Sequence, residues 1–156
     1  MRLLIGLGNP GEKYKNNRHN VGHMVVERLL DGGAKKNLIA RKSDAFINNS
    51  GEFVKKILDR YRLKAADLWV IHDDLDIPLG SYKIQKGKGP RLHNGINSIE
   101  EVLGTEDFWR VRVGVDNRDP EDRISGEEYV LQDFSAEEAK LLKPAIDQIC
   151  KKLATS

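Results

Sequence analysis

The chain has 156 residues, of which 39% are hydrophobic and 32% charged, and its formal net charge is +2. These values are typical of one soluble globular domain over residues 1–156 and exclude a disordered chain. No run approaches the roughly 20 apolar residues of a membrane span, so we expect no membrane partner. The lone cysteine, Cys150, excludes an intrachain disulfide, and we expect a cytoplasmic protein.

Short apolar runs alternate with helical periodicities along the chain. Strands are predicted at 3–7, 37–40, 68–71, 81–85 and 109–113, and helices at 20–30, 53–61, 96–103 and 136–153. Asn20 is predicted to cap the first helix, and Ser135 with Glu138 forms a capping box for the last. Pro144 is predicted to kink or divide that last helix. The alternation predicts a single α/β domain with a mostly parallel or mixed sheet.

The small net charge hides an uneven distribution. Residues 35–91 hold 13 Lys and Arg against 7 Asp and Glu, whereas residues 116–147 hold 4 against 10. Such asymmetry is a hint of a polyanion-binding face. The alternative is an ordinary solvated surface, since blocks of like charge usually only keep a protein soluble.

Polar side chains gather where predicted strands end and predicted helices begin: Asn9, His19, Asn20, Asn48, Asp73, His93 and Asn94. In open α/β sheets, ligands bind beyond the carboxyl ends of the strands. Histidine is the usual general base at neutral pH, a carboxylate such as Asp73 would orient it, and asparagine amides would hold water or an oxyanion. The alternative for His19 and the asparagines is a helix cap or a surface group. Asp74 and Asp76 are predicted to be solvated loop charges.

Other chemistries fit the sequence less well. Residues 6–11 (GLGNPG) match a dinucleotide fingerprint, but the predicted helix begins too late, near Asn20, to meet a pyrophosphate. There is no G-x-S-x-G nucleophile elbow, and Cys150 is better explained by packing. His19 and His23 have the i, i+4 spacing of zinc ligands, without the H-E-x-x-H pattern.

Ordered motifs over nearly the whole chain resemble bacterial-type peptidyl-tRNA hydrolases. They are GLGNPG at 6–11 with Tyr14, RHNVG at 18–22, FINNSG at 46–51, HDDLDIPLG at 72–80, HNG at 93–95 with Ser98 and Ile99, RVRVG at 110–114, and YVL at 129–131 with Phe134. The resemblance implies a twisted mixed sheet flanked by helices. It also implies hydrolysis of the ester that joins a peptide to the 3′ end of tRNA, by a monomer that uses no metal or other cofactor.

The resemblance also implies roles for individual residues. By motif position His19 is the general base that activates water, Asp73 orients and polarises His19, and Asn9 positions the water or the ester. The substrate-binding positions of the family fall on Tyr14, Asn20, Phe46, Asn48 and Asn94. Its tRNA phosphate-binding arginine is Arg112, with the basic residues of 83–91 nearby, of which Lys86, Lys88 and Arg91 are assigned to the phosphate site, while the family's phosphate-binding lysine is replaced by Gln85. A second hypothesis is a catalytically weak RNA-binding relative that keeps the scaffold and the basic face.

Overall fold

The computed structural model describes residues 1–33, 35–87, 90 and 92–155. Within them lie the strands β1 (Arg2–Gly6), β2 (Leu38–Lys42), β3 (Leu68–Pro78), β4 (Tyr82–Lys86) and β5 (Trp109–Asp116). They form one sheet in the order β2-β1-β3-β5-β4, in which every neighbouring pair is parallel except the antiparallel β4 and β5. The predicted mixed, mostly parallel sheet is therefore confirmed.

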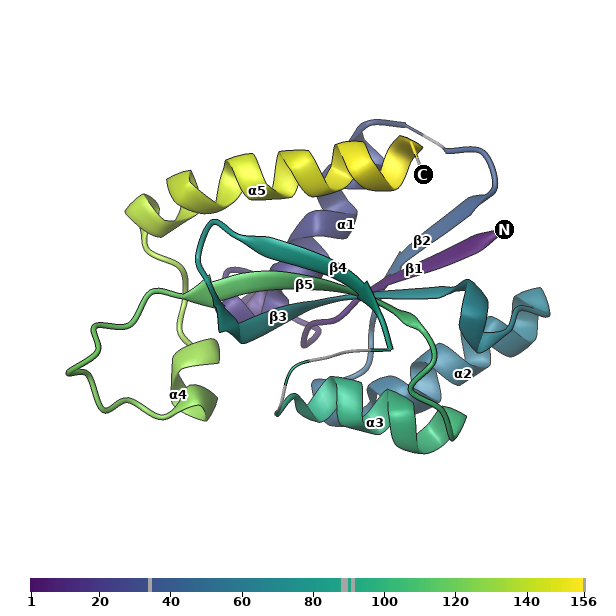
Figure 1. The fold of residues 1–156 in the computed structure, drawn as a ribbon, viewed down its shortest axis with the longest axis horizontal. Helices are drawn as coiled ribbons and strands as arrows, with labels where there is room; N and C mark the ends of the chain where they lie inside the picture. The colour runs from purple at the N-terminus through teal and green to yellow at the C-terminus, as the bar shows by residue number, and fades with distance from the viewer. Residues whose placement is uncertain (34, 88–89, 91, 156) are drawn as a thin grey trace.

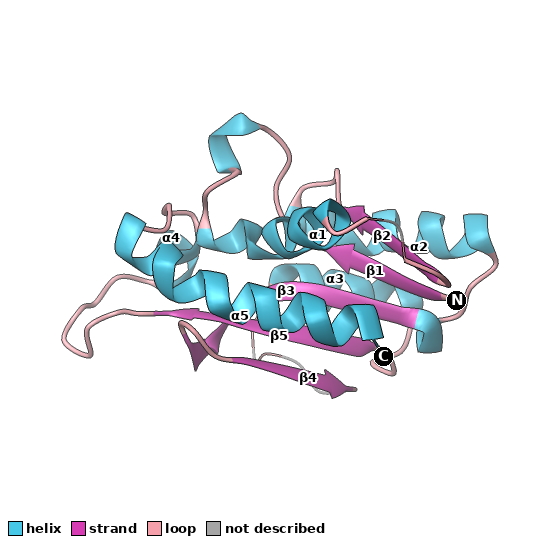
Figure 2. Ribbon diagram, turned by 90° about the horizontal axis from the view of Figure 1, so that it is seen from above, coloured by secondary structure: helices cyan, strands magenta, loops and turns pink. Residues whose placement is uncertain are grey.

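Helices cover both faces of this sheet. They are α1 (Val21–Asp31), α2 (Ser50–Tyr61), α3 (Asn94–Leu103), α4 (Gly126–Val130) and α5 (Ala136–Thr155), with short 3₁₀ turns η1 (Glu12–Tyr14), η2 (Arg18–Asn20), η3 (Ile47–Asn49) and η4 (Ala65–Asp67). Figure 1 shows α1 and α5 on one side of the sheet and α2 and α3 on the other, and Figure 2 shows the same layers from above. Among the described residues, none of these helices has the length and apolar character needed to cross a bilayer.

The two sides have separate hydrophobic cores because side chains alternate along each strand. In β1, Leu4 joins the α1 and α5 core, whereas Leu3 and Ile5 join the α2 and α3 core. Burial of these apolar faces is what fixes each strand's register relative to the helices.

Two glycines let α1 approach the sheet closely. A Cβ atom on Gly6 would lie 2.2 Å from the carbonyl oxygen of Gly22, and one on Gly22 would lie 2.4 Å from that of Ile71. Any side chain at either position would push α1 away from β1 and β3. The first glycine of the fingerprint-like motif therefore serves helix–strand packing, and α1 begins only at Val21, which leaves no helix N-terminus at the motif itself.

Two local predictions were wrong, and a third is narrowed. Asn20 makes no side-chain capping bond to α1, because its amide is used elsewhere. The region after residue 71 is not a loop: β3 continues to Pro78, because β5 runs alongside it and pairs Asp73 with Val113. Pro144 does not divide the last helix: α5 runs through it, and Pro144 lies on the exposed side, where water can solvate a freed carbonyl. The kink at Pro144 stays a prediction.

The capping box at the start of α5 is confirmed. The Glu138 backbone N–H donates to Ser135 Oγ over 3.1 Å, and the Ser135 N–H donates to Glu138 Oε1 over 2.9 Å. The short helix α4 was not predicted, because its five residues are too few to show a helical period.

Candidate active site

Three side chains meet beside the middle of β3, just beyond the carboxyl end of the shorter strand β1. His19 comes from η2, Asp73 from β3, and His93 from the position just before α3. The Nδ1 atom of His19 lies 2.7 Å from Asp73 Oδ2, and the Nε2 atom of His93 lies 2.7 Å from Asp73 Oδ1. One carboxylate thus lies between two imidazoles, and we call His19, Asp73 and His93 the catalytic cluster.

The contacts of each ring fix its tautomer. The Nδ1 atom of His93 accepts the backbone N–H groups of Gly95 and Ile96, at 3.1 and 3.2 Å, and so caps α3. The proton of His93 is therefore on Nε2, where it is donated to Asp73. His19 donates its Nδ1–H to the other carboxylate oxygen, so its Nε2 carries a lone pair. The His19 side chain is 15% exposed against 3% for Asp73, which makes His19 the member that a substrate can reach.

Burial and the carboxylate act in opposite directions on His19. Burial alone would lower the pKa of the imidazole, but the charge and the hydrogen bond of Asp73 outweigh it and raise the pKa of His19 above its ordinary value. For Asp73 burial would raise the pKa, yet the two imidazoles together hold it well below its usual range. Asp73 is therefore an anion at neutral pH that favours protonation of His19.

Asn9 is held in place by the residues around it. Its Oδ1 accepts the backbone N–H of Ile47 over 2.9 Å, and its side-chain Nδ2 has no partner among the described residues. Asn20 grips the backbone of Asn9 at both ends: its Oδ1 accepts the Asn9 N–H and its Nδ2 donates to the Asn9 carbonyl, each over 2.9 Å. Because Asn20 is only 1% exposed, the prediction that it binds substrate directly is corrected: it holds Asn9.

Four further residues are predicted to bind substrate. The rings of Tyr14 and Phe46 meet edge to face with centroids 6.2 Å apart, and Phe46 is 53% exposed. Asn48 and Asn94 are exposed and line one groove of about 460 Å³ between the N-terminal ends of α2 and α3. These residues thus form an aromatic pair and an amide-lined groove.

Arg112 is not a free cation. Its Nε donates to Asp74 Oδ2 and its Nη1 donates to Gln85 Oε1, both over 2.7 Å. The Asp74 side chain is fully buried in this ion pair, so the prediction that Asp74 is a solvated loop charge was wrong. Asp76, by contrast, is exposed.

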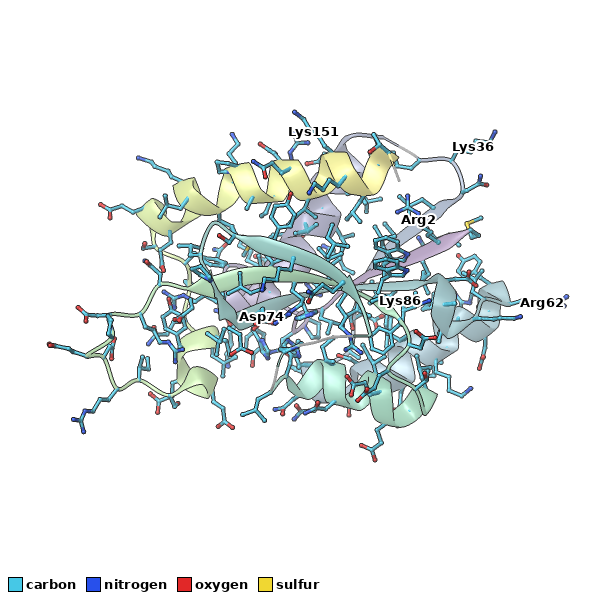
Figure 3. All side chains as sticks on the ribbon, in the orientation of Figure 1. Arg2, Lys36, Arg62, Asp74, Lys86 and Lys151 are labelled. Carbon is cyan, nitrogen blue, oxygen red and sulfur yellow. The ribbon has the colours of Figure 1, made fainter. Side chains whose placement is uncertain are left out.

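Strand register separates Lys86 from Arg112. Lys86 pairs with Trp109 at the start of β5, three positions from Arg112, so by strand alternation the two side chains leave opposite faces of the sheet. Figure 3 shows Lys86 toward the opposite end of the sheet from Asp74, the partner of Arg112. Lys86 also lies 3.7 Å from Asp107. The prediction that places Lys86 beside Arg112 is therefore corrected; Lys88 and Arg91 lie outside the described residues.

Lys83 takes the place that Lys86 was expected to fill. It pairs directly with Arg112 across β4 and β5, and residues opposite each other in register share a face. Lys83 is exposed, and no ion-pair partner for it occurs in the described part of the chain.

Arg18, next to His19, belongs to a second buried network. Its Nη2 donates to Glu138 Oε1 over 2.7 Å, its Nη1 donates to the Tyr129 carbonyl over 3.0 Å, and its guanidinium lies 3.8 Å from the Tyr129 ring centroid. Arg18 and Glu138 are each 6% exposed. We call this set the Arg18 anchor, because it fixes η2 to α4 and α5.

The same geometry bears on the rival chemistries. His23 donates its Nε2–H to the Ser43 carbonyl over 2.9 Å, so it does not join His19 as a zinc ligand. In the described residues, one group has metal-ligand spacing, namely the catalytic cluster itself, with ligand atoms within 4.8 Å of one another. Both of its N–H groups are already donated to Asp73, and a cation would have to displace them. Burial raises the pKa of the Cys150 thiol to about 11, which leaves it unreactive.

Sequence reasoning placed His93 among the polar side chains of the candidate site and Lys83 in the basic segment 83–91, but it assigned no individual contact to either of them or to Arg18. The position of His93 directly before a predicted helix was the available signal for a capping imidazole. That Lys83 and Arg112 share one face of the sheet follows from the register of β4 against β5, which cannot be read from the sequence. Arg18 gave no signal, because its partner Glu138 is 120 positions away.

Comparison with known proteins shows the family to which the chain belongs. A profile of the family described as "Peptidyl-tRNA hydrolase" matches residues 3–156. The chain belongs to the peptidyl-tRNA hydrolase family. A peptidyl-tRNA hydrolase of Geotalea daltonii is 40% identical over 167 residues, which cover 96% of this chain and 86% of the relative. One of Dehalococcoides mccartyi is 36% identical over 175 residues, covering 99% and 92%.

Solved structures of the family have the same fold. A crystal structure of a variant of the peptidyl-tRNA hydrolase of Acinetobacter baumannii superposes with a TM-score of 0.87 at 28% identity, covering 99% of this chain and 87% of that one. A hydrogenase maturation protease of Thermococcus kodakarensis, at a TM-score of 0.53 and 14% identity, shares the fold alone. The expected membership and fold class are thus confirmed, whereas the roles of individual residues stay predictions.

Proposed function

We propose that this chain hydrolyses the ester bond between a peptide and the 3′ end of tRNA, with His19 as the general base. The observation that carries the proposal is the carboxylate of Asp73 held between two imidazoles, with His19 Nε2 left open. Membership of the family supports the substrate, and the fixed tautomers support the direction of proton transfer.

The reaction follows from the atoms of the catalytic cluster. A water molecule gives a proton to His19 Nε2 while its oxygen attacks the ester carbonyl carbon, and the carbonyl becomes a tetrahedral oxyanion. The bond to the ribose 3′ oxygen then breaks, and the His19 imidazolium returns the proton to that oxygen. The products are a peptide with a free carboxyl end and a tRNA with a free 3′ hydroxyl. Asp73 stabilises the imidazolium between the two steps.

Asparagine amides would supply the remaining contacts. The Nδ2 group of Asn9 is a fixed donor for the water or the developing oxyanion, because the other end of its amide is bound to Ile47. Asn48 and Asn94 would bind the peptide backbone and the terminal nucleotide from the groove, and Tyr14 and Phe46 would contact apolar parts of the substrate.

For the tRNA, we propose a phosphate site formed by Arg112 and Lys83. Asp74 and Gln85 occupy two of the guanidinium's donors and fix its plane, while Nη2 has no partner among the described residues. Phosphate contacts carry no sequence information, which suits an enzyme that acts on many tRNAs. We further propose that the protein works as a monomer in the cytoplasm, where its lone thiol stays reduced.

The test is release of labelled peptide from peptidyl-tRNA by the wild type and by His19→Ala. A matched control is His23→Gln, because glutamine keeps an Nε2 donor for the Ser43 carbonyl and lies outside the catalytic cluster. We expect His19→Ala to lose about 10²- to 10⁴-fold in kcat, the usual contribution of general-base catalysis, and His23→Gln to keep its activity. Wild-type turnover no faster than His19→Ala would refute the proposal. Tight tRNA binding without turnover would instead support the RNA-binding alternative.

A further inference from the structure

One buried imidazole has no part in the mechanism so far. His72 precedes Asp73 on β3 and is completely buried. Its Nδ1 lies 2.8 Å from the backbone carbonyl oxygen of Asp73, which can only accept, so Nδ1 carries the proton. Its ring meets that of His93 edge to face, with centroids 5.1 Å apart. Residue Asp73 thus accepts an imidazole N–H at its backbone carbonyl as well as at each carboxylate oxygen.

The Asp73 carbonyl needs such a donor because β1 ends early. Along the edge that β3 shares with β1, the Ile71 carbonyl accepts the N–H of Leu7 over 2.9 Å. The next carbonyl on that side is that of Asp73, since carbonyls two residues apart on a strand project the same way. The segment after β1 would supply the donor for this carbonyl, but it has left the sheet by this point. The backbone N–H of Asn9 donates to Asn20 instead. The side chain of His72 supplies the donor that the sheet no longer does.

Simple packing does not account for an imidazole here. The Nε2 atom of His72 is buried without a hydrogen-bond partner among the described residues, and a buried unpaired polar atom destabilises the folded state. Burial, with smaller contributions from the neighbouring His93 and Arg110, lowers the pKa of His72 to about 3, so the ring is neutral and keeps one proton at neutral pH. An apolar residue would avoid the cost of Nε2 but would leave the Asp73 carbonyl unpaired.

We propose that His72 is a positioning residue: its Nδ1–H fixes the peptide plane of Asp73 and thereby the angle at which the Asp73 carboxylate meets His19. The effect on catalysis rests on the proposed function, whereas the effect on the His19–Asp73 contact does not.

Three substitutions separate this role from packing. Asparagine places an amide N–H near the position of the His72 Nδ1. Leucine has nearly the shape of asparagine but no hydrogen-bond donor. Glutamine has a donor, but its side chain is one bond longer, which puts the amide beyond the position of Nδ1. We expect His72→Leu and His72→Gln to lose about 10- to 100-fold in kcat with little change in KM, the scale expected when a reacting group is misplaced by about 1 Å. His72→Asn should recover to within about threefold of the wild type.

The pKa of His19, followed by NMR, gives a readout that packing alone would not move. If the Asp73 carboxylate turns away, burial prevails and the pKa of His19 should fall in His72→Leu and stay near its wild-type value in His72→Asn. The proposal is overturned if folded His72→Leu keeps the wild-type kcat and His19 pKa, or if His72→Asn is no better than His72→Leu.

The wild-type protein provides a test that needs no variant. Nitrogen-detected NMR of the His72 ring should show the Nδ1–H tautomer, and finding the proton on Nε2 would overturn the proposal even if the variants failed to fold. If the wild type released no peptide while the tautomer and the His19 pKa behaved as expected, the proposed function would fail and the role of His72 in holding Asp73 would stand.

Discussion

Arg18 and His19 are adjacent in the chain, yet their side chains enter two different buried networks. His19 enters the catalytic cluster, in which one carboxylate receives two neutral imidazoles and one ring keeps an open nitrogen. Arg18 enters an anchor in which a full positive charge meets a full negative charge, with both groups 6% exposed and bound to further partners.

The difference lies in what each network leaves unused. In the Arg18 anchor, Glu138 Oε1 accepts from Arg18 and the Ser135 N–H, while Oε2 lies 3.3 Å from the Asn117 amide nitrogen. In the catalytic cluster, the excess charge of Asp73 is balanced only when His19 takes up a proton. On the arginine side of the anchor, Nε is buried without a hydrogen-bond partner among the described residues. Both oxygens of the Glu138 carboxylate have donors, which suits a structural role, whereas the open Nε2 of His19 suits the chemistry that we propose.

The largest expected effect separates the two networks through Asp73→Asn. Asparagine keeps one oxygen for the two imidazole N–H groups and presents an NH2 donor in place of the other, so the His19 tautomer is no longer fixed, and kcat should fall by about 10²- to 10⁴-fold. Without the carboxylate, burial lowers the pKa of His19, so the acid limb of the pH–rate profile, where neutral His19 is required, should move to lower pH. Peptide release measured from about pH 5 to 9 checks both effects; an acid limb at its wild-type position would mean that Asp73 does not set the His19 pKa.

The opposite pattern is expected for Glu138→Ala. Breaking a buried pair by removal of one partner leaves Arg18 as an uncompensated charge, and the free energy of unfolding in urea should fall by about 3–5 kcal/mol. Under conditions where the variant is folded, the acid limb should keep its wild-type position, because Asp73 still faces His19. A wild-type unfolding midpoint would show that the anchor contributes no stability.

The anchor should also respond to acid in a defined direction. Burial tends to raise the pKa of Glu138, but the Ser135 N–H, Arg18 and Asn117 together lower it below its ordinary value. Its stabilisation is therefore fully present above the pKa of an unfolded glutamate and is lost as pH falls through the lowered pKa of the folded state. Urea unfolding of the wild type and Glu138→Ala should converge at acid pH.

The smallest expected effect is on tRNA binding, measured by comparing Lys83→Ala with Lys86→Ala. Lys83 shares the face of Arg112, whereas Lys86 lies on the other face near Asp107. The slope of log affinity against log salt should become shallower by about one for Lys83→Ala and stay unchanged for Lys86→Ala. Arg112→Ala is a poorer test, because it would leave the buried Asp74 carboxylate unpaired. Equal slopes for both lysine variants would remove Lys83 from the phosphate site.

Most of the fold could be predicted from local pattern. Helices at 20–30 and 53–61 and strands at 3–7 and 109–113 have strong periodicity and clear boundaries, and each is present within a few residues. The extension of β3 to Pro78 could not be predicted, because the sequence DDLD looks like a solvated loop until the burial of Asp74 against Arg112 is known.

The site was predicted in its residue types rather than in its contacts. His19, Asp73 and Asn9 follow from ordered motifs, but the pairing of His93 with Asp73, the grip of Asn20 on Asn9 and the ion pair of Arg112 all join different elements. Such contacts depend on register and on helix placement. Neither the register nor the helix placement can be read from a sequence pattern.

The pairing of Arg18 with Glu138 has a consequence for the synthesis of this protein on the ribosome. The two residues are 120 positions apart, and ribosomes add roughly 5–20 residues per second. About 6–24 s therefore pass between the synthesis of the segment that carries His19 and that of its partner in α5. Throughout that interval the growing chain is itself a peptide joined to tRNA, and its own candidate base has not yet been fixed in place.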